Sequence, residues 1–145
     1  MVQLALIGVG KIARDQHRPA IAEQPTFDLV ATVDPSAGVE GVPAYRDLAG
    51  LLADGPRVEA VAICTPPAVR HAIAAAAIDV GLHVLLEKPP AATLSQAADL
   101  ATHARTAGVT AFAAWHSREA AGVAPARAWL AGRTVRSATI AWRED

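Results

Sequence analysis

The feature that most constrains the fold is a glycine-containing turn, Gly8-Val9-Gly10-Lys11-Ile12-Ala13, which joins an apolar run to a helical pattern. The apolar run, residues 2–7, predicts a buried strand, and residues 12–23 predict a helix that Pro19 kinks or shortens. Gly8 permits a tight turn, Gly10 lets a pyrophosphate approach the backbone, and Ala13 allows close packing of the helix on the strand. Free N–H groups at the start of a helix bind phosphate. Residues 2–34 are therefore predicted to hold a dinucleotide through Gly8, Gly10, Lys11, Ile12 and Ala13.

An acidic residue completes this unit. Asp34 follows the second predicted strand, residues 27–33, and comes about 20 residues after Ala13, where an acid can accept hydrogen bonds from the ribose hydroxyls of the adenosine. About 4 Å from a 2′-phosphate the same charge would cost roughly 4 kcal/mol at an effective dielectric near 20, so Asp34 favours NAD over NADP. Lys11 and Arg14 would weaken this preference if they turned toward the ribose, which leaves NADP open. A plain strand–helix turn with a flanking Asp is the alternative reading of the whole pattern.

Strands and helices alternate along the chain, which predicts an α/β fold with a doubly wound, mostly parallel sheet, the Rossmann arrangement. The composition, 52% hydrophobic and 4% aromatic, fits Ala-rich helices packed on Val- and Ile-rich strands. Thr93 and Gln96 have the spacing of a capping box, in which Gln96 reaches back to the cap residue. The further strands are expected at residues 60–64, 83–86 and 109–114, the further helices at residues 45–53, 68–80, 94–107 and 125–130, and a loop at residues 36–43.

The end of the chain breaks this pattern. Residues 134–142 alternate, with Ala138, Ile140 and Trp142 on one face and polar residues on the other, which is typical of an open sheet with one solvated face. We therefore expect a NAD-binding domain at residues 1–118, followed at residues 119–145 by a connecting helix and the first strand of a C-terminal α/β domain that is otherwise missing. The alternative is a complete small domain with an ordinary edge strand, although an isolated strand is not stable alone.

Two proline-containing segments follow predicted strands, at the carboxyl edge where doubly wound sheets bind ligands. In Glu87-Lys88-Pro89, Lys88 could place an ammonium group against a substrate oxygen beside the nicotinamide, which suits acid–base work. A solvated lysine before a proline turn is the alternative. Thr65, Pro66 and Pro67 could wall the cofactor pocket or form a rigid loop. His71 is expected near the start of the next helix, close to the site, with an orienting role there.

A polar and aromatic segment, Trp115-His116-Ser117-Arg118, follows the fifth predicted strand at the same edge. Trp115, His116 and Arg118 suit a substrate such as a sugar, whose C–H face stacks on rings. Packing of Trp115 against another domain is equally open. His17, on the first helix, could face a substrate pocket, whereas His83 and His103 are expected to be structural or surface residues.

Several classes of partner and site are not expected. A net charge of -1 gives no electrostatic attraction to nucleic acid or to an anionic membrane. No apolar stretch reaches the roughly 20 residues of a membrane span, and the N-terminus lacks the basic segment of a signal peptide. A single Cys64 and five scattered His residues give no metal-ligand spacing. The sequence thus predicts a cytoplasmic protein without a metal site.

Several of these segments, in this order, resemble the glucose–fructose oxidoreductase / inositol dehydrogenase / MocA family. The resemblance covers essentially the whole chain, and its specific part is the Glu-Lys-Pro turn. The segments that carry it are Gly8-Val9-Gly10-Lys11-Ile12-Ala13, Asp34, Thr65-Pro66-Pro67, His71 and Glu87-Lys88-Pro89. Within the family, residues 10–17, 85–90 and 115–118 are most similar to members that oxidise D-galactose or L-arabinose at C1.

The resemblance implies an enzyme in which an N-terminal Rossmann domain holds NAD and a second α/β domain covers the nicotinamide. Hydride passes from a sugar or cyclitol carbon to the nicotinamide, and an aldose oxidised at C1 becomes a lactone. Lys88 is implied to be the catalytic lysine, with Glu87 near the cofactor ribose and the Lys88–Pro89 peptide bond cis. The second domain also implies a homo-oligomer of the full-length protein.

The same resemblance limits what residues 1–145 can do. Family members add an Asp and a His or Asn from the second domain, so this chain is expected to hold the cofactor without completing the reaction. Another sugar or inositol dehydrogenase of the family, and a nucleotide-binding module without turnover, are the alternatives.

Overall fold

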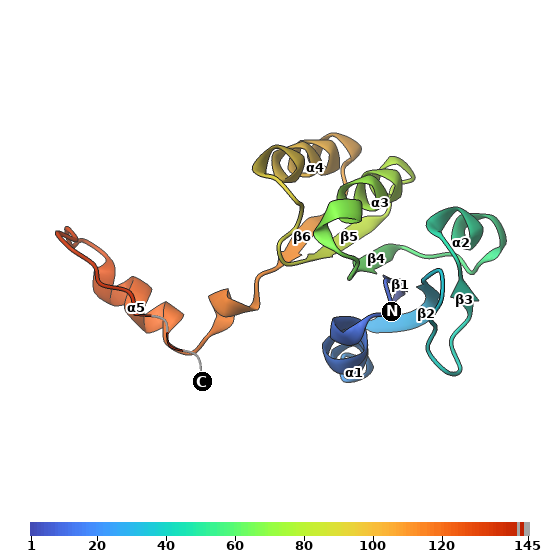
Figure 1. Cartoon of the computed structure of the whole chain (residues 1–145), viewed down its shortest axis with the longest axis horizontal. Coiled ribbons are helices and arrows are strands. Elements are labelled where there is room, and N and C mark those ends of the chain that lie inside the picture. The colour runs from blue at the N-terminus through green and yellow to red at the C-terminus, as the bar shows by residue number, and fades with distance from the viewer. Residues whose placement is uncertain (142, 144–145) are drawn as a thin grey trace. The chain divides into compact units, whose positions relative to one another are not determined.

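The fold is given by a computed structural model, which describes residues 1–141 and 143. The chain divides into two compact units, Met1–Ala114 and Trp115–Asp145. In the first unit, six strands form one parallel sheet in the order β3-β2-β1-β4-β5-β6 (Figure 1). The strands are β1 (Val2–Ile7), β2 (Phe27–Val33), β3 (Ala44–Tyr45), β4 (Ala60–Ile63), β5 (His83–Glu87) and β6 (Ala111–Ala114). The helical elements are η1 (Ala13–His17), α1 (Arg18–Ala22), α2 (Leu48–Asp54), α3 (Pro67–Asp79), α4 (Leu94–Ala107), η2 (His116–Glu119) and α5 (Val123–Leu130).

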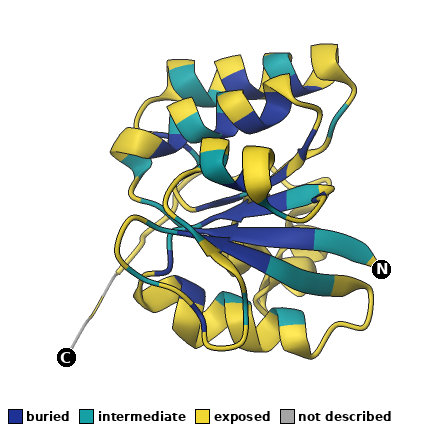
Figure 2. Ribbon diagram, turned by 90° about the vertical axis from the view of Figure 1, so that its right-hand side faces the viewer, coloured by how far each residue is buried: buried dark blue, intermediate teal, exposed yellow. Residues whose placement is uncertain are grey.

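Alternation along the strands decides which helices cover which face, because successive residues of a strand point to opposite sides of the sheet. In β1, Ala5 and Ile7 belong to the core shared with α2, α3 and α4, whereas Leu4 and Leu6 belong to the core beneath η1 and α1. Figure 1 shows α3 and α4 on one side of the sheet and α1 on the other, and Figure 2 shows buried positions running along the strands between them. The predicted doubly wound α/β fold is confirmed.

The first helix departs from regular α geometry just before Pro19. Residues 11–22 are helical, but Ala13–His17 is a π-helical turn in which the Arg18 N–H donates to the Ala13 carbonyl oxygen. Proline has no N–H to donate and its ring crowds the preceding turn, and π geometry occurs mostly as single turns within α-helices. The irregular turn lies directly before Pro19 and carries His17, while the helical residues extend past Pro19 to Ala22.

The segment after β2 differs from the sequence prediction. Ala44 and Tyr45 pair with Thr32 and Val33 as a short strand, where the sequence predicts the end of a loop and the start of a helix. The helix α2 begins later because Asp47 caps it, accepting from the Gly50 N–H at 2.8 Å. A two-residue strand is too short to show a period-2 pattern, so the sequence carries no signal for it.

Strand β6 begins at Ala111, later than predicted. Gly108 has a φ of 71°, and the Val109 N–H donates to the Ala104 carbonyl oxygen at 3.0 Å, so Val109 belongs to the end of α4. At the other end of α4 the Thr93 hydroxyl accepts from the Gln96 N–H at 3.2 Å, as a capping box requires. The Gln96 side chain instead accepts from the residue before the cap, the Ala92 N–H at 3.2 Å.

The second unit contains η2 and α5, and α5 confirms the helix predicted at residues 125–130. Residues 134–141 have no regular secondary structure, so the strand predicted at 134–142 is wrong for these residues, and Trp142 lies outside the described part. A strand is held by hydrogen bonds to a neighbouring strand, which apolar alternation alone does not supply. The Arg133 guanidinium lies 4.5 Å from the centre of the Trp129 ring, in a cation–π contact.

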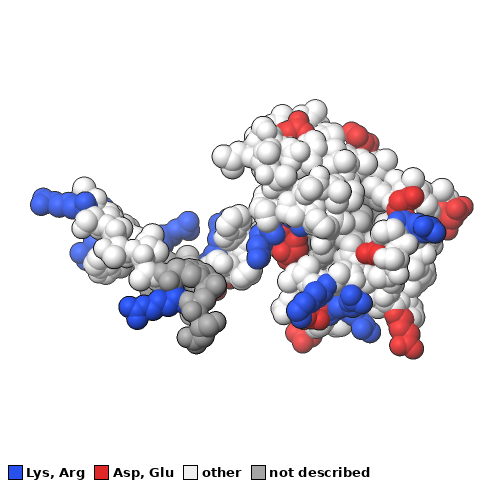
Figure 3. Space-filling model, viewed as in Figure 1, with Lys and Arg blue, Asp and Glu red and all other residues white. Residues whose placement is uncertain are grey.

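On the face of the first unit that Figure 3 shows, acidic and basic side chains are interspersed, in keeping with the net charge of -1. Within residues 1–141 and 143, no helix is long and apolar enough to cross a membrane. The same residues contain no group of three or more His, Cys, Asp or Glu side chains arranged to hold a metal ion.

Candidate cofactor and catalytic site

The glycine turn, residues 8–13, follows β1 at the carboxyl edge of the sheet. Gly8 has a φ of +85°, and a Cβ there would lie 2.9 Å from the Thr65 backbone nitrogen, so glycine is required on both counts. A Cβ on Gly10 would meet nothing within 4 Å. The backbone at Gly10 is thus open to an incoming group, which fits the close approach of a pyrophosphate. Ala13 is fully buried in the core beneath the helix, as close helix–strand packing requires.

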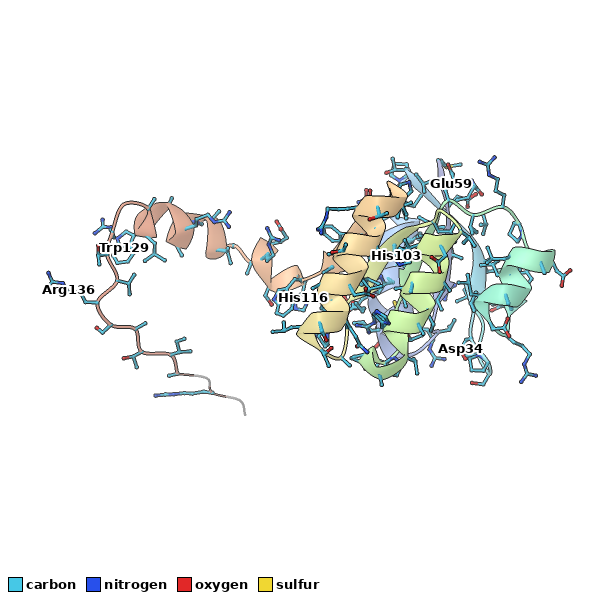
Figure 4. The ribbon with its side chains drawn as sticks, turned by 90° about the horizontal axis from the view of Figure 1, so that it is seen from above. Asp34, Glu59, His103, His116, Trp129 and Arg136 are labelled. Atoms are coloured by element: carbon cyan, nitrogen blue, oxygen red, sulfur yellow. The ribbon has the colours of Figure 1, made fainter. Side chains whose placement is uncertain are left out.

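Asp34, labelled in Figure 4, follows β2 and accepts a hydrogen bond from the glycine turn. Its Oδ2 accepts from the Val9 N–H at 2.9 Å, and its Oδ1 accepts from the N–H groups of Ser36 and Ala37, each at 2.9 Å. The Ser36 hydroxyl adds a bond to Oδ1 at 3.2 Å. Burial raises the pKa of Asp34, but these hydrogen bonds outweigh burial and hold the pKa below its ordinary value. The carboxylate is therefore ionised at neutral pH, and Oδ2 keeps a lone pair for a ribose hydroxyl.

Two other residues of the glycine turn lie on the surface. Lys11 forms an exposed ion pair with Asp15, one turn further along the helix. Ile12 is partly exposed. Surface exposure leaves both side chains accessible to a ligand, and their contact with a cofactor stays a prediction.

The lysine turn, Glu87-Lys88-Pro89, ends β5 and is joined to the first helix by a side-chain contact. Glu87 is buried; its Oε1 lies 2.8 Å from the Nε2 of His17, and its Oε2 accepts from the Lys88 N–H at 2.9 Å. The Lys88–Pro89 peptide bond is cis, as the family resemblance implies. The Lys88 side chain is exposed. The turn therefore combines an anchored backbone with an accessible ammonium group, while the His17 ring is bound to Glu87.

Arg70 is the residue of this region that the sequence reasoning misses. It is only 2% exposed, and its guanidinium donates to the carbonyl oxygens of Thr65, Glu87 and Pro89. Burial lowers the pKa of Arg70 and the nearby Glu87 carboxylate opposes that change, but an arginine remains a cation. A sequence signal was available, because Arg70 has the helical spacing of the inner face of α3. The buried residues of that helix are Arg70, Ala74, Ala77 and Ile78.

Cys64, directly after β4, lies in surroundings that disfavour its reactive form. Burial raises the pKa of its thiol to about 12, with a further rise from Glu87 and an opposing effect of Arg70. The thiol is therefore neutral at physiological pH, and the thiolate is the reactive form of cysteine.

The segment Thr65-Pro66-Pro67 lies directly against the glycine turn, since Thr65 is the residue that a Cβ on Gly8 would strike. Pro66 caps α3 and Pro67 is its first residue, a position where the missing N–H of proline costs nothing. The prolines therefore mark the turn from β4 into α3. Whether the segment also walls a cofactor pocket stays a prediction.

His71 and His103 each pair with an acid on the neighbouring helix. The Nε2 of His71 on α3 lies 2.7 Å from Asp99 Oδ2 on α4, and the Nε2 of His103 on α4 lies 2.8 Å from Asp79 Oδ1 on α3. The two pairs link the helices, and Figure 4 shows His103 on α4. The structural role expected for His103 is confirmed. His71 contacts α4, and its contact with a cofactor stays a prediction.

Trp115, His116 and Arg118 belong to the second unit. Trp115 caps the 3-10 turn η2, and His116 and Arg118 lie within it. All three side chains are exposed in that unit, so their rings and guanidinium are accessible. Their role as sugar contacts stays a prediction.

Known proteins share both the sequence and the fold of this chain. Residues 2–115 match the GFO/IDH/MocA family model, described as an oxidoreductase family with an NAD-binding Rossmann fold. Galactose 1-dehydrogenase of Pseudomonas fluorescens is 43% identical over an alignment that covers 99% of this chain and 46% of that protein.

Solved structures of dehydrogenases are also similar to this chain. D-galactose-1-dehydrogenase from Rhizobium etli is 48% identical, with a TM-score of 0.87 over 94% of this chain and 44% of that one. The WlbA dehydrogenase from Bordetella pertussis, solved with NADH and UDP-GlcNAcA, is 26% identical, with a TM-score of 0.73 over 81% of this chain and 36% of that one. The chain spans less than half the length of these relatives.

Proposed function

The chain belongs to the GFO/IDH/MocA oxidoreductase family, and on this premise we propose that it is the cofactor-binding part of an NAD-dependent aldose 1-dehydrogenase. D-galactose is the first substrate to test and L-arabinose the second. The proposal is supported by the 43% and 48% identity to two galactose dehydrogenases, over nearly the whole of this chain. In this proposal residues 1–118 form the cofactor domain, residues 119–145 begin the domain that completes the site, and the full-length protein is a homo-oligomer.

The observation that carries the chemistry is the lysine turn. Lys88 has an exposed side chain on a backbone that Glu87 and Arg70 hold from both sides. An acid–base group must be held within reach of the proton it transfers, and small displacements of such a group cost much of the rate. We assign Lys88 to the C1 hydroxyl of the sugar. In its neutral amine form, the side-chain nitrogen takes up the hydroxyl proton as C1 is oxidised to the lactone. The bound nicotinamide supplies the acceptor for the hydride.

The proposed cofactor is NAD rather than NADP. The Asp34 carboxylate is ionised, lies beside the glycine turn and keeps one lone pair for a ribose hydroxyl. A 2′-phosphate at that place would meet the negative charge. The residues proposed to contact the cofactor are Gly8, Gly10, Lys11, Ile12, Ala13, Asp34, Thr65, Pro66, Pro67, His71 and Glu87.

The residues proposed to contact the sugar are Lys88, Trp115, His116 and Arg118. His17 is proposed to act through Glu87, because its ring nitrogen already lies 2.8 Å from the Glu87 carboxylate.

The test is NADH formation by the full-length protein with D-galactose, L-arabinose, D-xylose and myo-inositol. We expect turnover of galactose or arabinose, and a loss of kcat of about 10²- to 10⁴-fold in Lys88→Ala, the range of a general acid–base group. The control is Arg105→Ala, at an exposed position of α4 where the arginine side chain donates a hydrogen bond to Thr102 of the same helix.

Each outcome has a distinct meaning. If Lys88→Ala keeps more than about a tenth of the activity, the acid–base role is wrong. Turnover of xylose or inositol alone would indicate a different dehydrogenase of the family. NADH binding with no turnover of any of the four would indicate a nucleotide-binding module.

A further inference from the structure

We propose that Arg70 is a positioning residue for Lys88, a role that rests on the proposed function. Its guanidinium forms hydrogen bonds to both the carboxyl end of β5 and the segment after β4. Arg70 would set where the lysine turn lies without touching substrate or cofactor.

The contacts bracket Lys88. Arg70 Nη1 donates to the carbonyl oxygens of Glu87 and Pro89, the residues on either side of Lys88, while Nη2 donates to that of Thr65. A guanidinium is planar and carries its donors in a fixed fork, so the three acceptors are held in one arrangement. The backbone on both sides of Lys88 is thereby fixed to the helix α3.

The third contact extends this arrangement to the proposed cofactor site. Thr65 lies close to Gly8: a Cβ atom on Gly8 would be only 2.9 Å from the backbone nitrogen of Thr65. One side chain therefore links the lysine turn, through Thr65, to the glycine turn. The spacing between a bound cofactor and Lys88 would depend on Arg70.

Burial makes this cation hard to replace. Arg70 is 2% exposed, and the buried Glu87 carboxylate is its nearby countercharge. A lysine at this position keeps the charge but has a single nitrogen and cannot span three carbonyl groups. A methionine fills similar volume but leaves buried carbonyl oxygens without donors, which is costly.

The experiment compares Arg70→Lys and Arg70→Met with wild type in the full-length protein. Three quantities are measured: the NADH dissociation constant, kcat per NADH-binding site, and amide hydrogen exchange of residues 87–92. His103→Gln is the matched control, because it removes an α3–α4 contact, the His103–Asp79 pair, at a distance along α3 from the turn.

We expect kcat per site to fall about 100-fold in Arg70→Met, the effect of a displacement near 1 Å, and by less in Arg70→Lys. Exchange at residues 87–92 should rise in both variants. The NADH affinity should fall by much less than kcat per site, because Arg70 contacts Thr65 and Glu87 of the proposed cofactor site but neither Gly10 nor Asp34. A purely structural role would lower stability and leave kcat per folded, NADH-binding site unchanged.

The proposal is overturned if both variants keep the kcat per site of His103→Gln, or if exchange in the turn does not change. If Arg70→Met does not fold, the kcat and hydrogen exchange of Arg70→Lys alone test the proposal. If wild type binds NADH but oxidises no sugar, the proposed function fails. Amide hydrogen exchange of residues 87–92 then still tests whether Arg70 fixes the lysine turn.

Discussion

The two turns at the carboxyl edge of the sheet are held by different kinds of contact. The glycine turn is held by the backbone conformation of Gly8 and by Asp34. The Asp34 carboxylate accepts a hydrogen bond from the N–H of Val9, 25 residues earlier in the chain. The lysine turn is held by side chains from other elements, His17 of η1, 70 residues from Glu87, and Arg70 of α3. We therefore expect the glycine turn to be altered mainly by substitutions within it. The lysine turn should also be altered by substitutions on η1 and α3.

The largest effect is expected from Gly8→Ala. A side chain there would adopt a left-handed φ and strike the Thr65 backbone, which should lower the free energy of unfolding by about 3 kcal/mol. NADH affinity should fall at least about 100-fold, because the turn that carries the phosphate site is displaced. Thermal unfolding and fluorescence titration with NADH measure the two quantities.

Gly10→Ala is the matched comparison. Its Cβ would meet open space, so we expect unchanged stability together with weaker NADH binding, since the methyl group occupies the space proposed for the pyrophosphate. Unchanged NADH affinity in Gly10→Ala would contradict the assignment of that space to the cofactor.

The next effect in size is expected from Asp34→Ser, measured as the ratio of kcat/KM with NADP to that with NAD. Removing the carboxylate removes the repulsion of a 2′-phosphate, so the ratio should rise about 100-fold after screening by solvent. Glu40→Ser, an exposed acid in the following loop, is the control. A ratio that does not change would mean that Asp34 serves only to hold Val9, Ser36 and Ala37.

This contrast also explains what could be predicted from the sequence. The glycine turn and its acid were predictable because their spacing is a local property of a strand, a turn and a helix. The pairing of His17 with Glu87 was not predictable, because it depends on the π-helical turn before Pro19 and on how η1 packs over the sheet. Arg70 was predictable in part, since a charged residue on the apolar face of an Ala-rich helix requires buried acceptors.

A smaller effect is expected from His17→Ala. The buried Glu87 carboxylate loses its partner, so stability should fall by about 1–3 kcal/mol. If Glu87 helps to hold Lys88, kcat should also fall, on the order of tenfold, with NADH affinity retained. His17→Gln, whose amide can donate to the same oxygen, should restore most of both quantities. A loss of stability with unchanged kcat would assign the pair a structural role alone.

The smallest effect is expected from His71→Gln. The His71–Asp99 pair is partly exposed, and pairs of this kind contribute about 0.2–1 kcal/mol. Asp79–His103 links the same two helices through the same chemistry, so His103→Gln should cost a similar amount. The informative quantity is NADH affinity, because the sequence predicts that His71 lies near the cofactor site, whereas the structure pairs it with Asp99 on α4. If both variants bind NADH as wild type does, the two pairs have the same role and His71 is removed from the cofactor site. If only His71→Gln binds NADH more weakly, His71 belongs to the site. Asp99 on α4 would then support His71 in the same indirect way that we propose for His17 and Glu87.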